Sequence, residues 1–298
     1  MIYTCTSNPS LDYYLCLEDD LQQGKINRTV DEHYDAGGKG VNVSIVLNGL
    51  HIPNTALGFL GGFSRGYFLS CLTPYTYLQP QFTRIQEATR INIKLNEHGQ
   101  ETSVNARGPH ISEEEFARFR LILQKVYPGD YFVLSGNVQE EIREQLHEVL
   151  KELVEEDTRL IIDTDAPFAK MCLDLHPYLL RLSLEEAEEV SGKSGDEGLK
   201  RLAEKARNVI CRKDNGWLMY HDEEVYEGIL HQNDSGSTTG RNDTCVAGFL
   251  FGLLRGASPE EAFRYGVAAA QIVSDADVLT ADLSGIEESY HTAEVRRL

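Results

Sequence analysis

The chain has 298 residues, 41% of them apolar and 25% charged, which is enough for a large core and excludes a disordered polypeptide. Its formal net charge of −19 repels DNA, RNA and anionic lipid, so we expect neither a nucleic-acid nor a membrane partner. No basic leader, membrane-length apolar run or C-x-x-C pair is present, so we expect a cytoplasmic protein whose six cysteines are free thiols.

The first third of the chain contains two strand-like segments, Leu11–Leu17 and Arg90–Leu95. Both alternate apolar and polar residues with a period of two, which is typical of strands with one buried face and one polar face. We expect them to form an antiparallel patch outside the main sheet. A small lid, with strands drawn from about residues 11–35 and 88–106, fits this pattern.

A glycine-rich turn lies between these strands. The segment Gly37-Gly-Lys-Gly-Val-Asn-Val-Ser44 runs into an apolar helical pattern, and a helix N-terminus can bind an anion. Its glycines would let the backbone approach a phosphate, and Lys39 would add a charge. The segment taken alone also fits a tight turn with a solvated lysine, and it lacks the spacing of a Walker A loop.

The strand at Thr89-Arg-Ile-Asn-Ile-Lys94 places three polar side chains on one face: Arg90, Asn92 and Lys94. A guanidinium, an amide and an ammonium group on one face can bind a phosphate and hydroxyls. An ordinary solvated strand face explains the same residues equally well.

The middle of the chain alternates strand-like and helix-like segments. Separating helices of this length imply βαβ units, and therefore a mainly parallel sheet covered on both faces, in the α/β class. We expect strands at Tyr131–Leu134, Arg159–Asp163, Tyr178–Leu182 and Asn208–Cys211, with helices at Glu140–Glu155, Leu184–Val190 and Gly195–Ala206.

A second glycine-led helix start lies at Gly240-Arg-Asn-Asp243. A carboxylate at this place could take a proton from a hydroxyl, while the neighbouring N–H groups stabilise a transferred phosphoryl group. An acidic residue followed by threonine at a helix start is, taken alone, more often a plain N-cap.

Together these segments resemble the ribokinase-like (phosphofructokinase B) carbohydrate kinases, in the branch of tagatose-6-phosphate kinase and 1-phosphofructokinase. The similarity runs from about Ile2 to about Gly285. The motifs that match in order are Asn8-Pro-Ser-Leu-Asp12, Gly37-Gly-Lys-Gly-Val-Asn42, Leu57-Gly-Phe-Leu-Gly-Gly-Phe63, Thr89-Arg-Ile-Asn-Ile-Lys94, Asn105-Ala-Arg-Gly-Pro109, Leu134-Ser-Gly136 and Asp243-Thr-Cys-Val-Ala-Gly248.

The resemblance implies a single domain over residues 1–298, folded as a three-layer α/β/α sandwich with a β-sheet lid. It also implies ATP and Mg²⁺, and a homodimer formed through the lid. The resemblance assigns Asp243 as the catalytic base and Gly240, Arg241 and Asn242 as the anion hole. It assigns Asp12, Gly38, Lys39, Asn42, Arg90, Asn92 and Ser135 to the substrate, Ser183, Lys213, Gly216 and Gln271 to the nucleotide, and Glu186 to the metal.

The departures from the family pattern lie on the nucleotide side. Asn242 replaces a glycine, and we expect it to adopt the glycine's left-handed backbone at a cost of roughly 1 kcal/mol. Ser183 replaces an asparagine, and Cys211-Arg-Lys213 replaces a Ser-Leu-Gly strand end.

Two interpretations remain open. In the first, the chain is a kinase for a ketohexose phosphate (tagatose 6-phosphate, fructose 1-phosphate or fructose 6-phosphate), and Arg241 and Lys213, or these two together with Arg212, replace backbone contacts to ATP. Alternatively, it is a sugar-phosphate-binding or regulatory homologue with impaired ATP binding.

Overall fold

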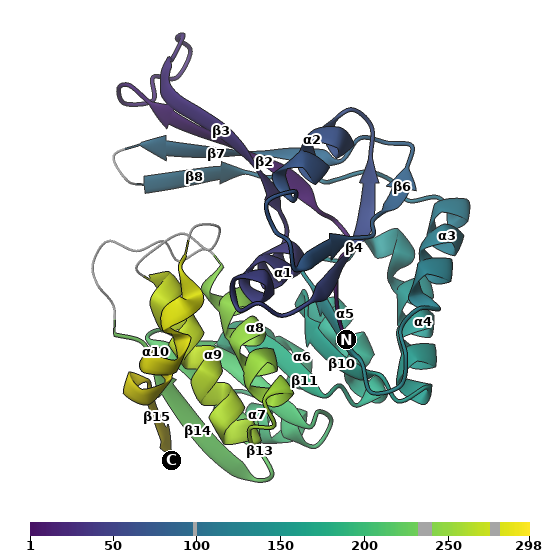
Figure 1. Cartoon of the computed structure of the whole chain (residues 1–298), viewed down its shortest axis with the longest axis vertical. Helices are drawn as coiled ribbons and strands as arrows, with labels where there is room; N and C mark the ends of the chain where they lie inside the picture. The colour runs from purple at the N-terminus through teal and green to yellow at the C-terminus, as the bar shows by residue number, and fades with distance from the viewer. Residues whose placement is uncertain (98–99, 232–239, 275–280) are drawn as a thin grey trace.

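The computed structural model describes residues 1–97, 100–231, 240–274 and 281–298. They form a body with a large central sheet, and a small second sheet projects from it (Figure 1).

The central sheet has the strand order β15-β14-β13-β12-β11-β10-β9-β1-β4-β5, with β6 paired to β4. The strands from β12 to β5 run parallel, and β13, β14 and β15 continue the sheet as antiparallel strands. The prediction of a mainly parallel sheet is therefore confirmed. The strands are β1 Ile2–Thr6, β4 Asn54–Gly61, β5 Leu78–Pro80, β6 Thr83–Ile85, β9 Tyr131–Ser135, β10 Arg159–Asp163, β11 Leu179–Ser183, β12 Asn208–Lys213, β13 Gly216–His221, β14 Glu224–Ile229 and β15 Glu294–Arg297.

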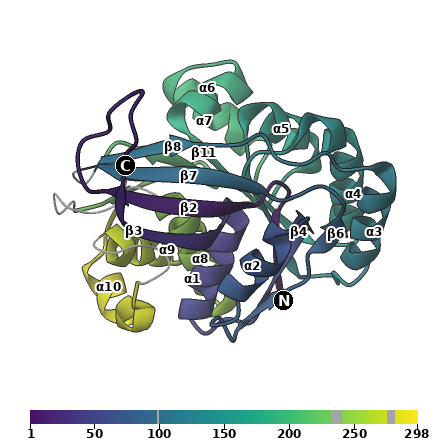
Figure 2. The same ribbon diagram turned by 90° about the horizontal axis from the view of Figure 1, so that it is seen from above.

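Helices cover both faces of this sheet, as the buried parallel strands require (Figure 2). One face packs against α3 Glu113–Leu123, η1 Glu140–Ile142, α4 Arg143–Glu155, α5 Ala166–Met171, η2 Cys172–Leu175, α6 Leu184–Ser191 and α7 Gly195–Ala203. The other face packs against α1 Lys39–Gly49, α8 Arg241–Leu254, α9 Pro259–Ser274, η3 Leu283–Gly285 and α10 Ile286–Thr292.

Helix α8 is buried on nearly every side, because it lies between α1 and α9 on this face of the sheet. The two helices approach closely at Gly248, where an added Cβ would lie 2.5 Å from the carbonyl oxygen of Tyr265. Only glycine fits at that contact, and the contact fixes the position of the helix that carries Asp243.

The second sheet, which we call the lid, has the order β3-β2-β7-β8. Its strands are β2 Ser10–Leu17, β3 Thr29–Gly37, β7 Arg90–Glu97 and β8 Gln100–Val104, and α2 Ser64–Cys71 packs beside its base. The prediction of an antiparallel patch is wrong in one respect, because β2 and β7 pair in parallel. Both strands leave the same edge of the central sheet, one after β1 and the other after β6, so they emerge in the same direction.

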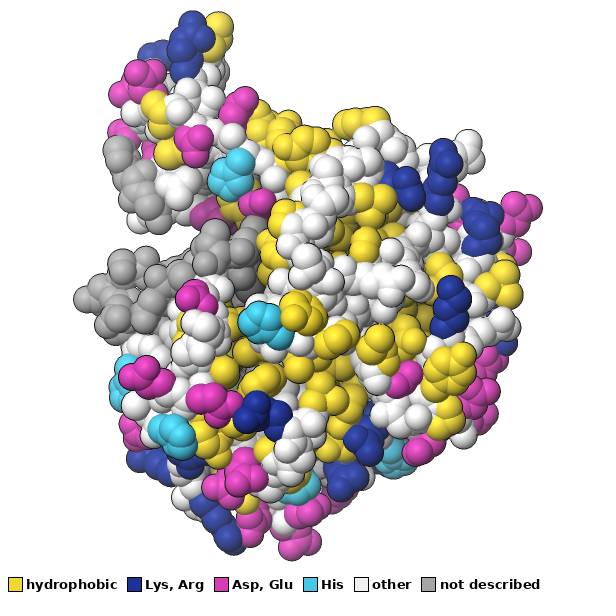
Figure 3. All heavy atoms as spheres, viewed as in Figure 1, with side chains coloured by type: hydrophobic (Ala, Val, Ile, Leu, Met, Phe, Trp, Pro, Cys, Tyr) yellow, Lys and Arg dark blue, Asp and Glu magenta, His cyan; other side chains and the backbone are white. Residues whose placement is uncertain are grey.

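The six cysteines are free, and four of them are buried: Cys5, Cys172, Cys211 and Cys245. In the part of the chain that the structure describes, no helix combines the length and the apolar character needed to cross a bilayer. Acidic and basic side chains are interspersed over the face shown in Figure 3.

Candidate active site

The carboxyl ends of the parallel strands place three polar side chains on the face that α1 and α8 cover. Ser135 at the end of β9 pairs in register with Asp163 at the end of β10, and Arg181 follows on β11. All three side chains are buried, with exposures of 1%, 0% and 3%. Polar groups at the carboxyl ends of neighbouring parallel strands are typical of binding sites in open α/β sheets.

Asp243 lies in the first turn of α8, at the same edge of the sheet. Its carboxylate is buried, and its Oδ2 accepts a hydrogen bond of 2.8 Å from Nδ2 of Asn42 on α1. The structure thus joins two predicted site residues that lie 201 positions apart in the chain.

The turn before α8 differs from the expectation for Asn242. Gly240 has the left-handed backbone, with φ of 80°, whereas Asn242 already belongs to the right-handed helix. The predicted strain at Asn242 is therefore absent. Its side chain is used elsewhere, because Oδ1 accepts a hydrogen bond of 3.1 Å from Nε1 of Trp217.

A buried ion pair between Asp163 and Arg181, which the sequence analysis missed, lies near Asp243. Arg181 donates from Nε and from its terminal nitrogen to Oδ1 of Asp163, at 3.0 and 2.6 Å. Nζ of Lys39 lies 3.6 Å from the same oxygen, so the predicted lysine belongs to this cluster. A charged residue at the end of an otherwise apolar parallel strand was the signal in the sequence for Asp163.

These neighbours set the protonation of the two carboxyl groups in opposite directions. Burial disfavours the ionised form of Asp163, but the charges of Arg181 and Lys39 outweigh it and hold its pKa below the ordinary value. Burial, and then the negative charge of Asp163, raise the pKa of Asp243 to about 7. A carboxylate with this pKa can accept a proton near neutral pH.

In the lid, polar side chains donate hydrogen bonds to Asp12. Oδ1 of Asp12 accepts hydrogen bonds from Ser10 Oγ at 2.7 Å and from Asn92 Nδ2 at 2.8 Å. Asn92 also accepts a hydrogen bond from the backbone N–H of Ala106, and Arg90 donates to two backbone carbonyl oxygens. Asp12 and Asn92 pair in register on neighbouring strands, and hydrogen bonds hold both side chains.

The glycine-rich turn before α1 is shaped by close packing. Gly38 has φ of 136°, and a Cβ there would lie 2.7 Å from Cγ2 of Thr6. This turn brings Lys39 and Asn42 of α1 to the carboxyl edge of the sheet.

The residues predicted for the nucleotide lie along β11 to β13 and on α9. Ser183 and Glu186 form a capping box at the start of α6. Lys213 makes an ion pair of 2.6 Å with Glu227, and Gly216 has φ of 147° where β13 passes close to β14. The Gln271 amide exchanges two hydrogen bonds with the backbone of His231.

Glu186 is the predicted metal residue. Its Oε2 accepts a hydrogen bond of 2.7 Å from the N–H of Ser183, while Oε1 takes part in no hydrogen bond with the described residues. Within those same ranges, no group of three His, Cys, Asp or Glu side chains could hold a metal ion. One such carboxylate fits Mg²⁺ when phosphate oxygens and water supply the other ligands.

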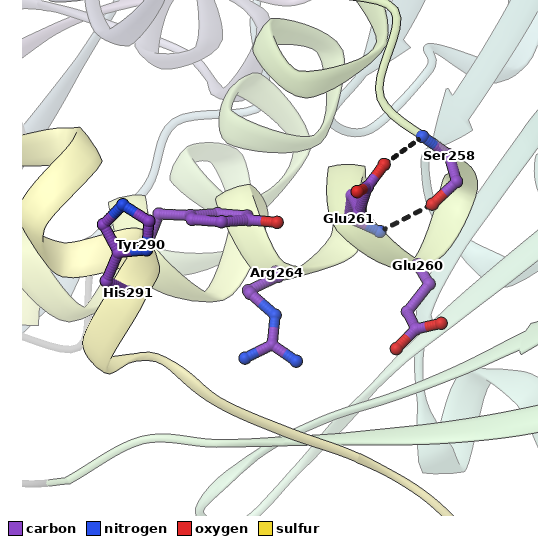
Figure 4. A pocket seen from close by; sticks show the side chains of 6 residues that line it. All are labelled: Ser258, Glu260, Glu261, Arg264, Tyr290 and His291. Carbon is purple, nitrogen blue, oxygen red and sulfur yellow. Dashed lines mark hydrogen bonds between the residues drawn. The ribbon is translucent and has the colours of Figure 1, made fainter.

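A separate cavity of about 560 Å³ opens between the start of α9 and α10. Figure 4 shows Arg264 and the Ser258–Glu261 capping pair on one side, and Tyr290 and His291 on the other. Asp243 lies at the opposite end of α8, about 16 Å away along the helix. No predicted site residue lines this cavity.

Comparison with known proteins gives consistent matches along the chain. The sequence profile described as pfkB family carbohydrate kinase matches residues 7–277. The 1-phosphofructokinase of Borreliella burgdorferi is 33% identical over 279 residues, which cover 90% of this chain and 90% of that protein. The D-tagatose-1-phosphate kinase of Bacillus licheniformis is 30% identical, and the alignment covers 100% of both chains.

A solved structure supports the same architecture. The phosphofructokinase-2 from Escherichia coli, in complex with substrates and products, superposes with a TM-score of 0.90. The superposition covers 98% of each chain at 21% sequence identity, so it shows the fold alone. The predicted three-layer α/β/α sandwich with a β-sheet lid is confirmed.

Proposed function

The chain belongs to the pfkB family of carbohydrate kinases, and from that premise we propose that it transfers the γ-phosphoryl group of ATP to a hydroxyl of a ketohexose phosphate, with Asp243 as the base. The observation that carries the proposal is the buried carboxylate of Asp243 in the first turn of α8, held by Asn42 and with its pKa raised to about 7. A base of this pKa is matched to proton transfer at neutral pH.

The residues would divide the work as follows. Asp243 takes the proton of the sugar hydroxyl, and the oxygen of that hydroxyl forms a bond to the γ-phosphorus. The bond between the γ-phosphorus and the bridging oxygen breaks, and ADP leaves. The first N–H groups of α8, from Gly240 to Asn242, stabilise the charge on the transferred group. Lys39 supplies a positive charge beside Asp163 at the same edge.

The lid would recognise the sugar phosphate. Asp12 accepts hydrogen bonds from sugar hydroxyls through Oδ2, since Oδ1 is already occupied by Ser10 and Asn92. Arg90, Asn92 and Lys39 would bind the phosphate that the substrate already carries. Ser135 offers a buried hydroxyl that has no partner in the described ranges. Both curated relatives are named for sugars with the phosphate at carbon 1, so a ketohexose 1-phosphate is the first substrate to test.

We also propose ATP and Mg²⁺ as donor and metal. Magnesium neutralises charge between phosphate oxygens when bound. Glu186 would hold it with its unused Oε1. Ser183 and Gly216 lie along the same edge, and Arg241, which is 3% exposed, sits at the first position of α8.

The test is a screen for ADP release with fructose 1-phosphate, tagatose 1-phosphate, tagatose 6-phosphate and fructose 6-phosphate, with and without Mg²⁺. Turnover with one of them should fall by about 10²–10⁴-fold in Asp243→Asn, because the base is lost while the shape is kept. Equal rates in the two proteins would contradict the role of Asp243. Sugar-phosphate binding without ATP binding or turnover would support the binding homologue instead.

We further propose that two copies pair through the outer face of the lid. Tyr13, Ile93 and Val104 lie in one row across β2, β7 and β8, on the face away from Asp12. The exposures of Ile93 and Val104 are 39% and 61%, and Tyr13 stacks on Tyr34 with ring centroids 4.1 Å apart. An apolar row of this kind on a projecting sheet is typical of a surface that another copy covers.

Analytical ultracentrifugation tests the dimer. The wild-type chain should sediment as a dimer, and Ile93→Lys should sediment as a monomer with an unchanged circular dichroism spectrum. Leu121→Lys on α3, which replaces another exposed apolar residue, is the matched control and should leave the dimer intact. A wild-type monomer at micromolar concentration would overturn this proposal.

A further inference from the structure

Arg212 is a cation to which the proposed function assigns no role. It stands near the end of β12 and pairs in register with Trp217 on β13. Its guanidinium carbon lies 4.7 Å from the centroid of the Trp217 ring, which is completely buried. A planar guanidinium stacked on a fixed indole keeps one orientation, and its edge remains available for hydrogen bonds.

The position of Arg212 on the sheet follows from the register. Ile210 pairs with Arg181, and Arg212 is two residues further along the same strand. Because side chains alternate between the faces, Arg212 lies on the same face as Arg181 and one step nearer the carboxyl edge. This is the edge at which α8 begins.

The electrostatic environment of Arg212 is unfavourable for a cation. Its pKa is lowered by burial and then by the positive charge of Arg241, with a smaller effect of Arg181, against the opposite effects of Cys245 and Asp214. In residues 1–97, 100–231, 240–274 and 281–298, no carboxylate lies within 4 Å of its guanidinium. The contacts recorded there, besides the indole, are carbonyl oxygens of Gly216 and Asp214, each at 3.4 Å. A bound anion would relieve this accumulation of like charge.

Trp217 connects Arg212 to the turn that carries the base. Its indole N–H donates to Oδ1 of Asn242, the residue directly before Asp243. The same ring therefore supports Arg212 on its face and holds the start of α8 through its edge. An anion that contacts Arg212 would also lie close to the first N–H groups of α8.

The neighbouring residue Lys213 is less available than Arg212 to contact a bound anion. Lys213, predicted for the nucleotide, is engaged with Glu227, which Arg296 also contacts. Moving Lys213 to a phosphate would break this ion pair, whereas Arg212 would break no ion pair with a described residue.

We propose that Arg212, held on Trp217, binds the phosphate chain of the phosphoryl donor. The inference rests on the proposed kinase function and deepens it by naming a donor-side residue. The guanidinium edge can donate two parallel hydrogen bonds to phosphate oxygens. Recognition is directed at the phosphates, so inorganic pyrophosphate binds the same place as the nucleotide.

Trp217 is the only tryptophan of the chain, so its fluorescence reports on this place directly. The full-length protein is titrated with ATP, ADP and pyrophosphate, each with Mg²⁺, and affinities are measured in parallel by calorimetry. Each ligand should change Trp217 emission saturably. Arg212→Gln should weaken all three affinities by about tenfold to a hundredfold, the range for one lost charge-assisted contact.

Kinetics separates a donor contact from a general loss of structure. Arg212→Gln should raise the KM for ATP by a similar factor and leave the KM for the sugar phosphate within about twofold. Arg207→Gln is the matched control, because Arg207 also lies over an aromatic ring, Tyr178, at the opposite end of β12. Its affinities should equal those of the wild type. Arg212→Lys, which keeps the charge, should fall between wild type and Arg212→Gln.

The results separate the proposed role of Arg212 from the proposed kinase function. Calorimetric affinities of Arg212→Gln within about twofold of the wild type would overturn the inference. If that variant does not fold, Arg212→Lys replaces it, and unchanged affinities in Arg212→Lys would overturn the inference in the same way. Pyrophosphate binding that depends on Arg212, in a protein without kinase turnover, would sustain this anion site and refute the proposed function.

Discussion

The body and the lid each present an aspartate to the candidate site, and the two are held in opposite ways. Asp243 in the body is 3% exposed, lies near the charges of Asp163, Arg181 and Lys39, and has its pKa raised to about 7. Asp12 in the lid is half-buried and is held by the neutral donors Ser10 and Asn92.

The difference shows how one residue type serves two purposes. In the body, burial and then the charges at the carboxyl ends of β10 and β11 set the affinity of Asp243 for a proton. In the lid, uncharged hydrogen bonds fix the direction of a carboxylate. The body therefore controls reactivity and the lid controls geometry, and each can be disturbed separately.

Breaking the buried ion pair should have the largest effect. Arg181→Met leaves Asp163 buried without its main partner, so the free energy of unfolding should fall by about 3–5 kcal/mol in urea titrations. The control is Arg120→Met, which breaks an ion pair with Glu152 in which both side chains are about half exposed. It should cost no more than about 1 kcal/mol. Equal losses in the two variants would contradict the importance of the buried charge.

The raised pKa of Asp243 predicts that replacing this residue by asparagine stabilises the protein more at high pH than at low pH. Between its ordinary value of 3.8 and about 7, the folded protein holds a proton that the unfolded chain has released, so wild-type stability falls as pH rises through this window. Asp243→Asn removes this loss. Its stability relative to the wild type should be greater at pH 8 than at pH 5 by about 2–4 kcal/mol, measured by urea unfolding. A gain of the same size at both pH values would show that the carboxyl group is not so perturbed.

The pH dependence of the rate should follow the same carboxylate. In the wild type, kcat/KM should rise with pH and level off above about 7 as Asp243 loses its proton. Asp163→Asn removes a nearby negative charge that raises this pKa, so the inflection should move to lower pH by about one unit. An inflection that stays in place would separate Asp163 from the control of Asp243.

The lid should show a smaller effect, confined to substrate binding. Asn92→Ala frees Asp12 from one of its two donors, so the KM for the sugar phosphate should rise about fivefold to thirtyfold while kcat changes less. Asn96→Ala, at an exposed position further along β7, is the matched control and should leave both constants unchanged. A loss in kcat at constant KM for Asn92→Ala would mean that the lid also takes part in the reaction.

Much of the architecture could be predicted from local patterns. The continuous apolar runs at Tyr131–Leu134 and Arg159–Asp163 indicated strands buried on both faces, and the structure has β9 and β10 there. The glycine-led start of α8 was found in the same way. The lid was expected, but the parallel pairing of β2 with β7 depends on where two distant strands leave the central sheet.

The sequence by itself determined which residue types stand at helix starts and strand ends, because backbone propensity and hydrophobic period act over a few residues. It therefore pointed to Asp243, Lys39 and Asn92. Only the tertiary structure decided their partners, since the Asn42–Asp243 hydrogen bond and the Asp163–Arg181 ion pair join distant segments. Protonation depends on burial and on charges a few ångströms away, so the pKa of Asp243 became readable only when the chain was folded.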